Sequence, residues 1–179
     1  MTYLPNNNNP KGNYQTDPIV EERLGRLHLK TTFLIRKFVN DEDYQQNKPF
    51  EESRFESNIG LNEGIGEMID LACTLGSPTA YSNAIAQSGV GDSTAAEVAT
   101  QTDLQAAINK TYVGMDASYP SRSAQTVSFR STFGSASANY AWNEFIVRNG
   151  ATALKDLIRK VSAQGTKTSG QTWELTTNI

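Results

Sequence analysis

Alternating apolar and polar residues give the clearest structural signal in the chain. Residues 126–133 alternate between the two classes, which is typical of a strand with one buried face. Residues 140–147 are apolar on both faces, which predicts a strand that is covered on both sides. The small residues at 134–137 separate the two segments. We therefore expect an antiparallel hairpin at the centre of a β domain.

Two more segments alternate in the same way. Residues 27–39 place Phe33 and Ile35 on one face, and residues 172–179 do so with Trp173 and Leu175. Both segments are predicted strands, the second of which ends the chain inside a sheet.

The polar, mostly acidic stretch at residues 40–57 is predicted to be a loop. Its runs Asp41-Glu42-Asp43 and Glu51-Glu52 could bind a cation, although solvated surface charge is the more common role of such runs.

One segment, residues 61–75, has the apolar spacing of a helix. The positions recurring at intervals of four and three are Leu61, Ile65, Met68, Ala72 and Leu75, with Ile69 beside them. Asn58 is the expected N-cap and Gly76 the expected end. We expect this helix to cover an open end or face of the β domain, and Cys73 within it to be a small core residue.

The remaining segments are less regular. Residues 85–90 and 110–115 are predicted short strands, and the glycine-rich residues 89–94 are predicted to make a tight turn. Residues 154–161 leave two alternatives open, because their apolar spacing fits a helix and the same residues could also form a strand.

Composition limits the possible partners. The chain has 179 residues, a formal net charge of −3 and no block of Lys and Arg, which argues against binding a nucleic-acid backbone. Its single cysteine excludes an intrachain disulfide. We find neither a signal peptide nor an apolar run long enough to cross a bilayer, so we expect synthesis in a cytoplasm and no membrane partner.

No stretch predicts catalysis, a metal site or a cofactor. His28 is the only histidine, so with one cysteine it cannot build a zinc site, and no nucleophile elbow supports a triad. The glycines at 89–92 lack the lysine of a phosphate loop. Asp92, Asp116 and Glu144 could converge as glycosidase carboxylates, but no aromatic platform or spacing supports that reading. We expect a protein that is not an enzyme.

The chain divides into an extended N-terminal arm, residues 1–22, and a β domain, residues 23–179. The arm holds three prolines and a run of asparagines, without apolar periodicity. Fully extended it could reach roughly 70 Å, at about 3.3 Å per residue. The arm residues expected to contact a neighbouring molecule are Tyr3, Leu4, Tyr14, Ile19 and Val20. In the alternative arrangement the arm folds back on its own subunit.

Ordered motifs over residues 60–179 resemble a family of small virion proteins of tailed bacteriophages. The motifs are Leu61-Asn62-Glu63-Gly64-Ile65, Gly89-Val90-Gly91-Asp92-Ser93-Thr94, Thr100-Gln101-Thr102-Asp103-Leu104-Gln105, Met115-Asp116, Tyr119-Pro120, Phe133, Ala138-Asn139, Ala141-Trp142-Asn143-Glu144 and Gly165-Thr166-Lys167-Thr168. The chain departs from the family at Phe145, where a second Trp is common, and at Leu154 to Ile158. For residues 154–161 the resemblance favours a strand.

This resemblance implies a mainly β protein, an antiparallel β-sandwich or jelly-roll-like domain with one short helix, that serves as a virion component. The first hypothesis is a capsid decoration, or cement, protein: a homotrimer assembled in the host cytoplasm that binds the major capsid protein. The second is another virion role, in the tail, neck, baseplate or fibre attachment. The third is a receptor- or glycan-binding module that uses Tyr119, Tyr140 or Trp142 for stacking.

Overall fold

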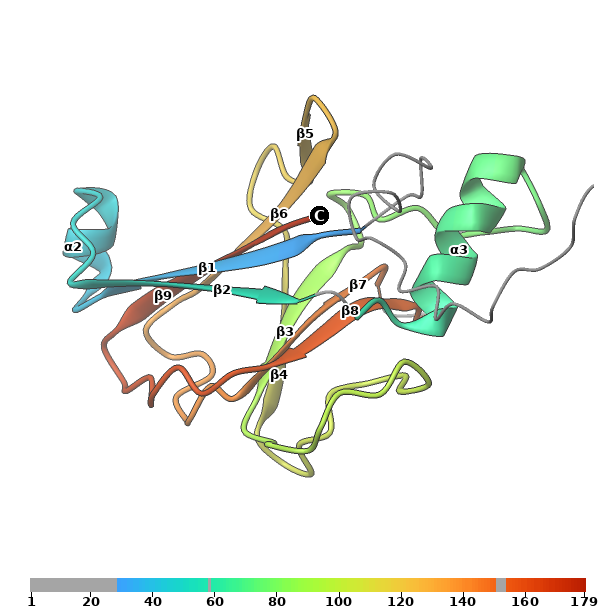
Figure 1. Cartoon of the computed structure of the whole chain (residues 1–179). Helices are drawn as coiled ribbons and strands as arrows, with labels where there is room; N and C mark the ends of the chain where they lie inside the picture. Colours follow the sequence, from blue (N-terminus) through green and yellow to red (C-terminus); the bar gives the residue numbers. More distant parts are fainter. Residues whose placement is uncertain (1–28, 58, 151–153) are drawn as a thin grey trace, which may run out of the picture.

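The chain folds as a β-sandwich of two antiparallel sheets (Figure 1). Our computed structural model describes residues 29–57, 59–150 and 154–179. The five-stranded sheet consists, in pairing order, of β2 (Glu51–Ser57), β1 (Thr31–Phe38), β9 (Thr172–Asn178), β6 (Thr126–Phe133) and β5 (Ser121–Ser123). The four-stranded sheet consists of β4 (Lys110–Gly114), β3 (Gln87–Gly91), β7 (Glu144–Arg148) and β8 (Asp156–Val161).

An aromatic core fills the space between the sheets. Trp142 lies at its centre and packs edge-on against Phe133 and Trp173, with ring centroids 4.8 Å and 4.9 Å away. Phe33 and Phe145 are buried beside them. Edge-to-face aromatic pairs of this kind stabilise a core beyond the area that they bury. The predicted mainly β sandwich is confirmed, with the alternating faces of β1, β6 and β9 turned inward.

The predicted hairpin of residues 126–147 is wrong, because its two strands lie in different sheets. β6 pairs with β9 and β5, whereas β7 pairs with β3 and β8. β7 is apolar on both faces because it is covered twice: Phe145 and Val147 face the core, while Ile146 packs against Leu61 and Leu104 on the other side. The residues between β6 and β7 cross from one sheet to the other and carry Trp142 into the core.

Residues 40–57 form two elements rather than the predicted loop. Asn40 caps the short helix α2 (Asp41–Gln45) by accepting a hydrogen bond from the backbone of Asp43. β2 follows as an edge strand of the sheet. Charged side chains of β2 form ion pairs with β1, as in Lys37–Glu51 at 2.6 Å. Phe55, the aromatic residue of β2, stacks on the buried Phe33 ring. Polar side chains suit an exposed sheet edge, which explains why apolar alternation missed this strand.

The glycines at 89–91 lie inside β3 and not in the predicted turn. A Cβ atom on Gly89 would lie 2.6 Å from the Tyr112 ring and 2.7 Å from Ile146. A Cβ atom on Gly91 would lie 2.4 Å from the Glu144 carboxylate. These glycines therefore let neighbouring side chains approach the strand closely.

The second helix, α3 (Asn62–Cys73), confirms the predicted helical segment but not its caps. Its N-cap is Leu61 rather than Asn58, and it ends at Thr74, which has a left-handed backbone with φ of 56°. Cys73 is exposed instead of being a core residue.

For residues 154–161 the sequence left helix and strand as alternatives. The structure has a strand there, β8.

Candidate interaction surface

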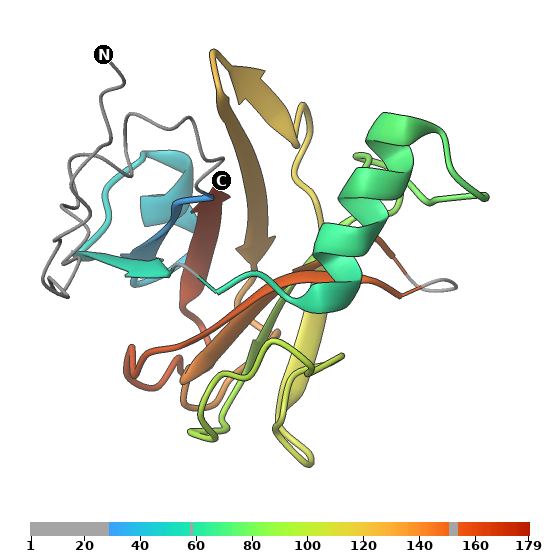
Figure 2. The ribbon, with the colours of Figure 1, turned by 45° about the vertical axis from the view of Figure 1, so that its right-hand side comes forward.

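Helix α3 is attached to the body of the protein by its first half. A Cβ atom on Gly64 would lie only 2.3 Å from the Cα of Leu157, so the helix backbone sits directly on β8. Nearby, a Glu63 carboxylate oxygen accepts a hydrogen bond of 2.8 Å from the backbone of Asp156. Figure 2 shows the helix rising from β8, with its far end standing clear of both sheets. The helix therefore projects from the sandwich and does not lie across a sheet.

Apolar side chains continue along the projecting half. Gly64 and Glu67 are the buried residues of the helix, and Leu71, four positions after Glu67, falls on the same side. Ile69, Leu71 and Leu75 are 54%, 37% and 53% exposed. We call these three residues the α3 surface. Leu71 thus continues the side that the body covers at the start of the helix, whereas Ile69, two positions earlier, lies roughly on the opposite side, and Leu75 follows the end of the helix. The projecting end is therefore apolar and exposed on more than one side, which is typical of a protein-binding site.

The charged side chains of helix α3 itself are all acidic. The helix carries Glu63, Glu67 and Asp70, and no Lys, Arg or His occurs in the sequence between Arg54 and Lys110. A partner for this surface should therefore combine apolar residues with basic ones.

A buried ion pair lies beneath the base of α3. The Asp156 carboxylate is fully buried and accepts a hydrogen bond from Arg148 Nε at 3.1 Å, while its second oxygen has no hydrogen-bond partner. Burial raises the pKa of Asp156 to about 7, with a further increase from Glu63 and Asp103, against the lowering effect of Arg148. The anchor of α3 therefore contains a carboxyl group that titrates near neutrality.

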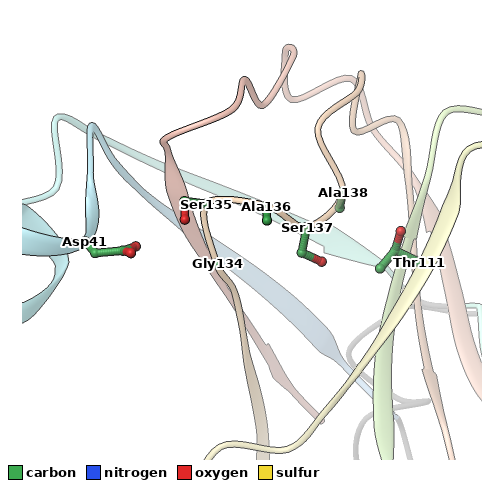
Figure 3. A pocket seen from close by; sticks show the side chains of 7 residues that line it. All are labelled: Asp41, Thr111, Gly134, Ser135, Ala136, Ser137 and Ala138. Atoms are coloured by element: carbon green, nitrogen blue, oxygen red, sulfur yellow. The ribbon is translucent and has the colours of Figure 1, made fainter.

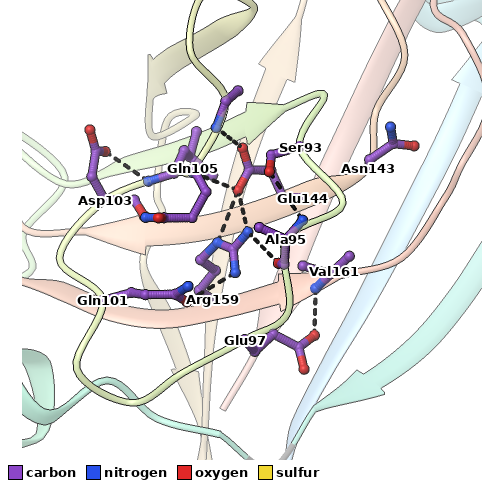
Figure 4. A network of polar contacts seen from close by, with 12 residues as sticks. Ser93, Ala95, Glu97, Gln101, Asp103, Gln105, Asn143, Glu144, Arg159 and Val161 are labelled. Atoms are coloured by element: carbon purple, nitrogen blue, oxygen red, sulfur yellow. Dashed lines mark hydrogen bonds and ion pairs between the residues drawn. The ribbon is translucent and has the colours of Figure 1, made fainter.

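A second buried network fastens the 92–109 segment to the four-stranded sheet (Figure 4). Glu144 and Arg159 are both fully buried and 2.6 Å apart. The Glu144 carboxylate also accepts backbone hydrogen bonds of 2.8 Å from Gln105 and Ala106, and Arg159 donates to the Ala95 carbonyl at 3.0 Å. Glu144 is thus committed to holding this segment in place.

The three carboxylates considered for glycosidase chemistry are engaged separately. Glu144 is bound within the network just described, and Asp116 accepts hydrogen bonds from Arg130 and Thr132. Asp92 accepts a hydrogen bond from Asn109. Each carboxylate has its own structural partners, so their positions do not favour a shared catalytic role.

A shallow hollow of about 580 Å³ lies beside the turn after β6 (Figure 3). Asp41, Thr111 and residues 134–138 line it. Lys167 is fully buried, donates to the Gly134 carbonyl and the Asn139 side chain at 2.8 Å each, and so holds the turn in shape. Burial lowers the pKa of the Lys167 ammonium to about 8. With Asp41 as the one charged side chain in its lining, the hollow shows no convergence of groups for a ligand.

The stacking residues proposed for a glycan are occupied within the fold. Trp142 is fully buried and donates its indole N–H to the Ala138 carbonyl. Tyr140 donates its hydroxyl to the Val90 carbonyl, and the Arg130 guanidinium covers the Tyr119 ring at 4.3 Å. Trp142 therefore cannot present a face to a sugar.

The predicted arm contacts Tyr3, Leu4, Tyr14, Ile19 and Val20 lie outside the described residues, as does His28. They stay predictions.

Among residues 29–57, 59–150 and 154–179, no cluster of three or more His, Cys, Asp or Glu side chains could hold a metal ion. Over the same ranges, no helix has both the length and the apolar character needed to cross a membrane.

Comparison with known proteins found no matching family model, no matching curated protein and no matching solved structure.

Sequence reasoning missed the α3 surface. The sequence predicted the apolar stripe of the helix, and Ile69 and Leu75 were expected to pack on the β domain. The spacing of apolar residues does not show how much of the helix the β domain covers.

Proposed function

We propose that this protein is a structural component of a tailed-bacteriophage virion, a decoration protein that binds the capsid lattice through the α3 surface. The observation that carries the proposal is the exposure of Ile69, Leu71 and Leu75 at the far end of a helix that projects from a well-packed sandwich. Large apolar residues exposed together at one end of an element cost solubility and are typical of a surface that a partner covers. The ordered sequence motifs described above supply the virion context.

The modest size of the surface suits a lattice. A small apolar contact gives weak affinity for one partner, but repetition around an oligomer raises the effective concentration of each contact. A homotrimer that presents three α3 surfaces to the major capsid protein would gain in this way. The N-terminal arm, with Tyr3, Leu4, Tyr14, Ile19 and Val20, would add further contacts.

A binding experiment with purified particles tests this function. The variant Ile69→Asp/Leu75→Asp should bind particles at least about tenfold more weakly, because burying each Ile or Leu is worth about 1.5–3 kcal/mol. Ile108→Asp is the matched control, since Ile108 is 87% exposed and lies outside α3. Quantitative mass spectrometry of the particles gives the copy number.

We expect wild-type protein and the control to reach a copy number comparable with that of the capsid protein. A copy number of a dozen or fewer would instead indicate the tail, neck or baseplate role. Equal attachment of wild type and the α3 variant would remove the α3 surface from the proposal.

A further inference from the structure

We propose that α3 is a pH-sensitive element, which stays docked on β8 while the buried Asp156 carboxyl group holds a proton and loosens when that proton is lost. The inference goes beyond the proposed function, because it concerns how the helix is held in the free subunit. It is argued from the contacts between the first turn of α3 and the start of β8.

The first turn of α3 is docked on the backbone of the residue that carries the buried carboxyl group. A Cβ atom on Gly64 would lie 2.5 Å from the carbonyl oxygen of Asp156. The backbone N–H of Asp156 donates a hydrogen bond of 2.8 Å to the Glu63 carboxylate. The backbone N–H of Leu61 donates one of 3.0 Å to the Leu157 carbonyl. A change at Asp156 therefore acts directly on the contact that holds the helix.

Asp156 has little positive charge around it. Its side chain is fully buried, and one carboxylate oxygen accepts a hydrogen bond from Arg148 Nε at 3.1 Å while the other has no hydrogen-bond partner. Arg148 is shared, because its Nη2 lies 3.7 Å from an Asp103 oxygen and its guanidinium carbon lies 4.1 Å from the centre of the Tyr112 ring. A buried carboxylate that has only part of one cation is costly, and the protonated form avoids that cost.

The other carboxyl groups near Asp156 oppose its ionisation or are engaged elsewhere. Glu63 on α3 and Asp103 on the 92–109 segment both disfavour the ionised form of Asp156. Asp103 is itself paired with Lys110 at 2.7 Å. Glu67, also on α3 and 8% exposed, accepts hydrogen bonds from the segments beside it. None of these groups adds a cation next to Asp156.

Two tyrosines complete the surroundings, and both are neutral. Tyr81 donates its hydroxyl to a backbone carbonyl at 3.1 Å, and Tyr112 donates its hydroxyl to Asp103. Burial is the main cause that raises the pKa of each hydroxyl. In the described part of the chain, Arg148 is the one basic side chain that forms an ion pair with Asp156.

Loss of the proton should loosen α3 rather than the sheet. Burial raises the pKa of Asp156 to about 7, with Glu63 raising it further against the lowering effect of Arg148. Once ionised, the Asp156 and Glu63 carboxylates repel each other across the contact between β8 and α3. β8 is held by its pairing with β7, whereas the far half of α3 stands clear of both sheets (Figure 2), so the helix is the part that can move and admit water.

Hydrogen exchange of the full-length protein tests the proposal. It is read by mass spectrometry between pH 5 and pH 8 and corrected for the pH dependence of the chemical exchange rate. The protection of α3 peptides should fall at least about tenfold between pH 5 and pH 7, because release of the helix returns Asp156 toward its ordinary pKa of 3.8. Peptides from β6 and β9 should change less. Asp156→Asn should remove most of the pH dependence in α3.

Two further variants sharpen the test. Glu63→Gln keeps an oxygen for the Asp156 backbone N–H but removes the like charge, so its α3 should lose less protection with rising pH than that of wild type. Asp70→Asn is the matched control, since it removes a charge from the same helix seven positions further along and should behave as wild type.

Protection of α3 that is constant with pH, or that falls as steeply in Asp156→Asn or Glu63→Gln as in wild type, would overturn the inference. Equal losses of protection in α3 and in the strands would also overturn it, because they would indicate global unfolding. The measurement uses the free subunit, so its outcome does not depend on whether the protein attaches to particles.

Discussion

At the scale of single residues, close backbone contacts fix how α3 and the sheets fit together. Gly64 sits on Leu157, and Gly89 and Gly91 leave room for Tyr112, Ile146 and Glu144. None of these roles is visible in the sequence, where a glycine inside a helical or strand pattern signals only local weakness or a turn. The tertiary neighbour that needs the space is far away in the chain.

Gly64→Ala should destabilise the protein by about 2–3 kcal/mol, because the new Cβ would overlap the Leu157 backbone, which cannot move aside like a flexible side chain. Gly66→Ala is the matched control: it has nothing within 4 Å and should be neutral or up to ~1 kcal/mol more stable. Urea denaturation measures both. Equal stabilities would show that α3 does not rest on β8.

Asp156 should make the folded protein less stable as the pH rises from acid to neutral. Its pKa in the folded protein is about 7 instead of 3.8, so folding favours the protonated form. The contribution of Asp156 to the free energy of unfolding is fully present below pH 3.8 and is lost as the pH rises to about 7. Asp156→Asn stays neutral and can still accept a hydrogen bond from Arg148. Denaturation at several pH values should therefore show a smaller decline in unfolding free energy for this variant than for wild type, and parallel declines would refute the assignment.

At the scale of elements, apolar alternation was informative for strands with one buried face and uninformative elsewhere. It located β1, β6 and β9. It missed β2, whose edge position tolerates a mostly charged sequence. It found β7 but assigned the wrong partner, because burial on both faces shows that a strand is covered and not which sheet it joins. Such pairings connect distant residues, so no local pattern encodes them.

The Glu144–Arg159 pair should be the most sensitive polar contact between elements. Glu144→Gln should cost about 3–5 kcal/mol, since it leaves the fully buried Arg159 without a compensating charge. Glu56→Gln is the control, because its ion pair with Lys30 is exposed and should contribute less than ~1 kcal/mol. Thermal unfolding of both variants tests the difference, and similar losses would mean that the buried pair does not hold the 92–109 segment.

At the scale of the whole molecule, the account depends on a helix that extends beyond the body it is attached to. The sequence predicted the helix and its apolar stripe. It could not predict which part of the stripe is uncovered, because that depends on where β8 and the segments beside it end. Ile69 and Leu75 therefore appeared as expected core contacts, although the structure leaves both exposed.

Cys73 provides the most direct test that the α3 surface is covered in the assembled protein. It is the only cysteine, it is exposed, and it lies four residues after Ile69 on the same side of α3. The measurement is the rate at which a maleimide labels Cys73 in the free subunit and in the particle-bound form. We predict fast labelling of the free subunit and at least about tenfold slower labelling in the assembly. Equal rates in the two states would contradict the account.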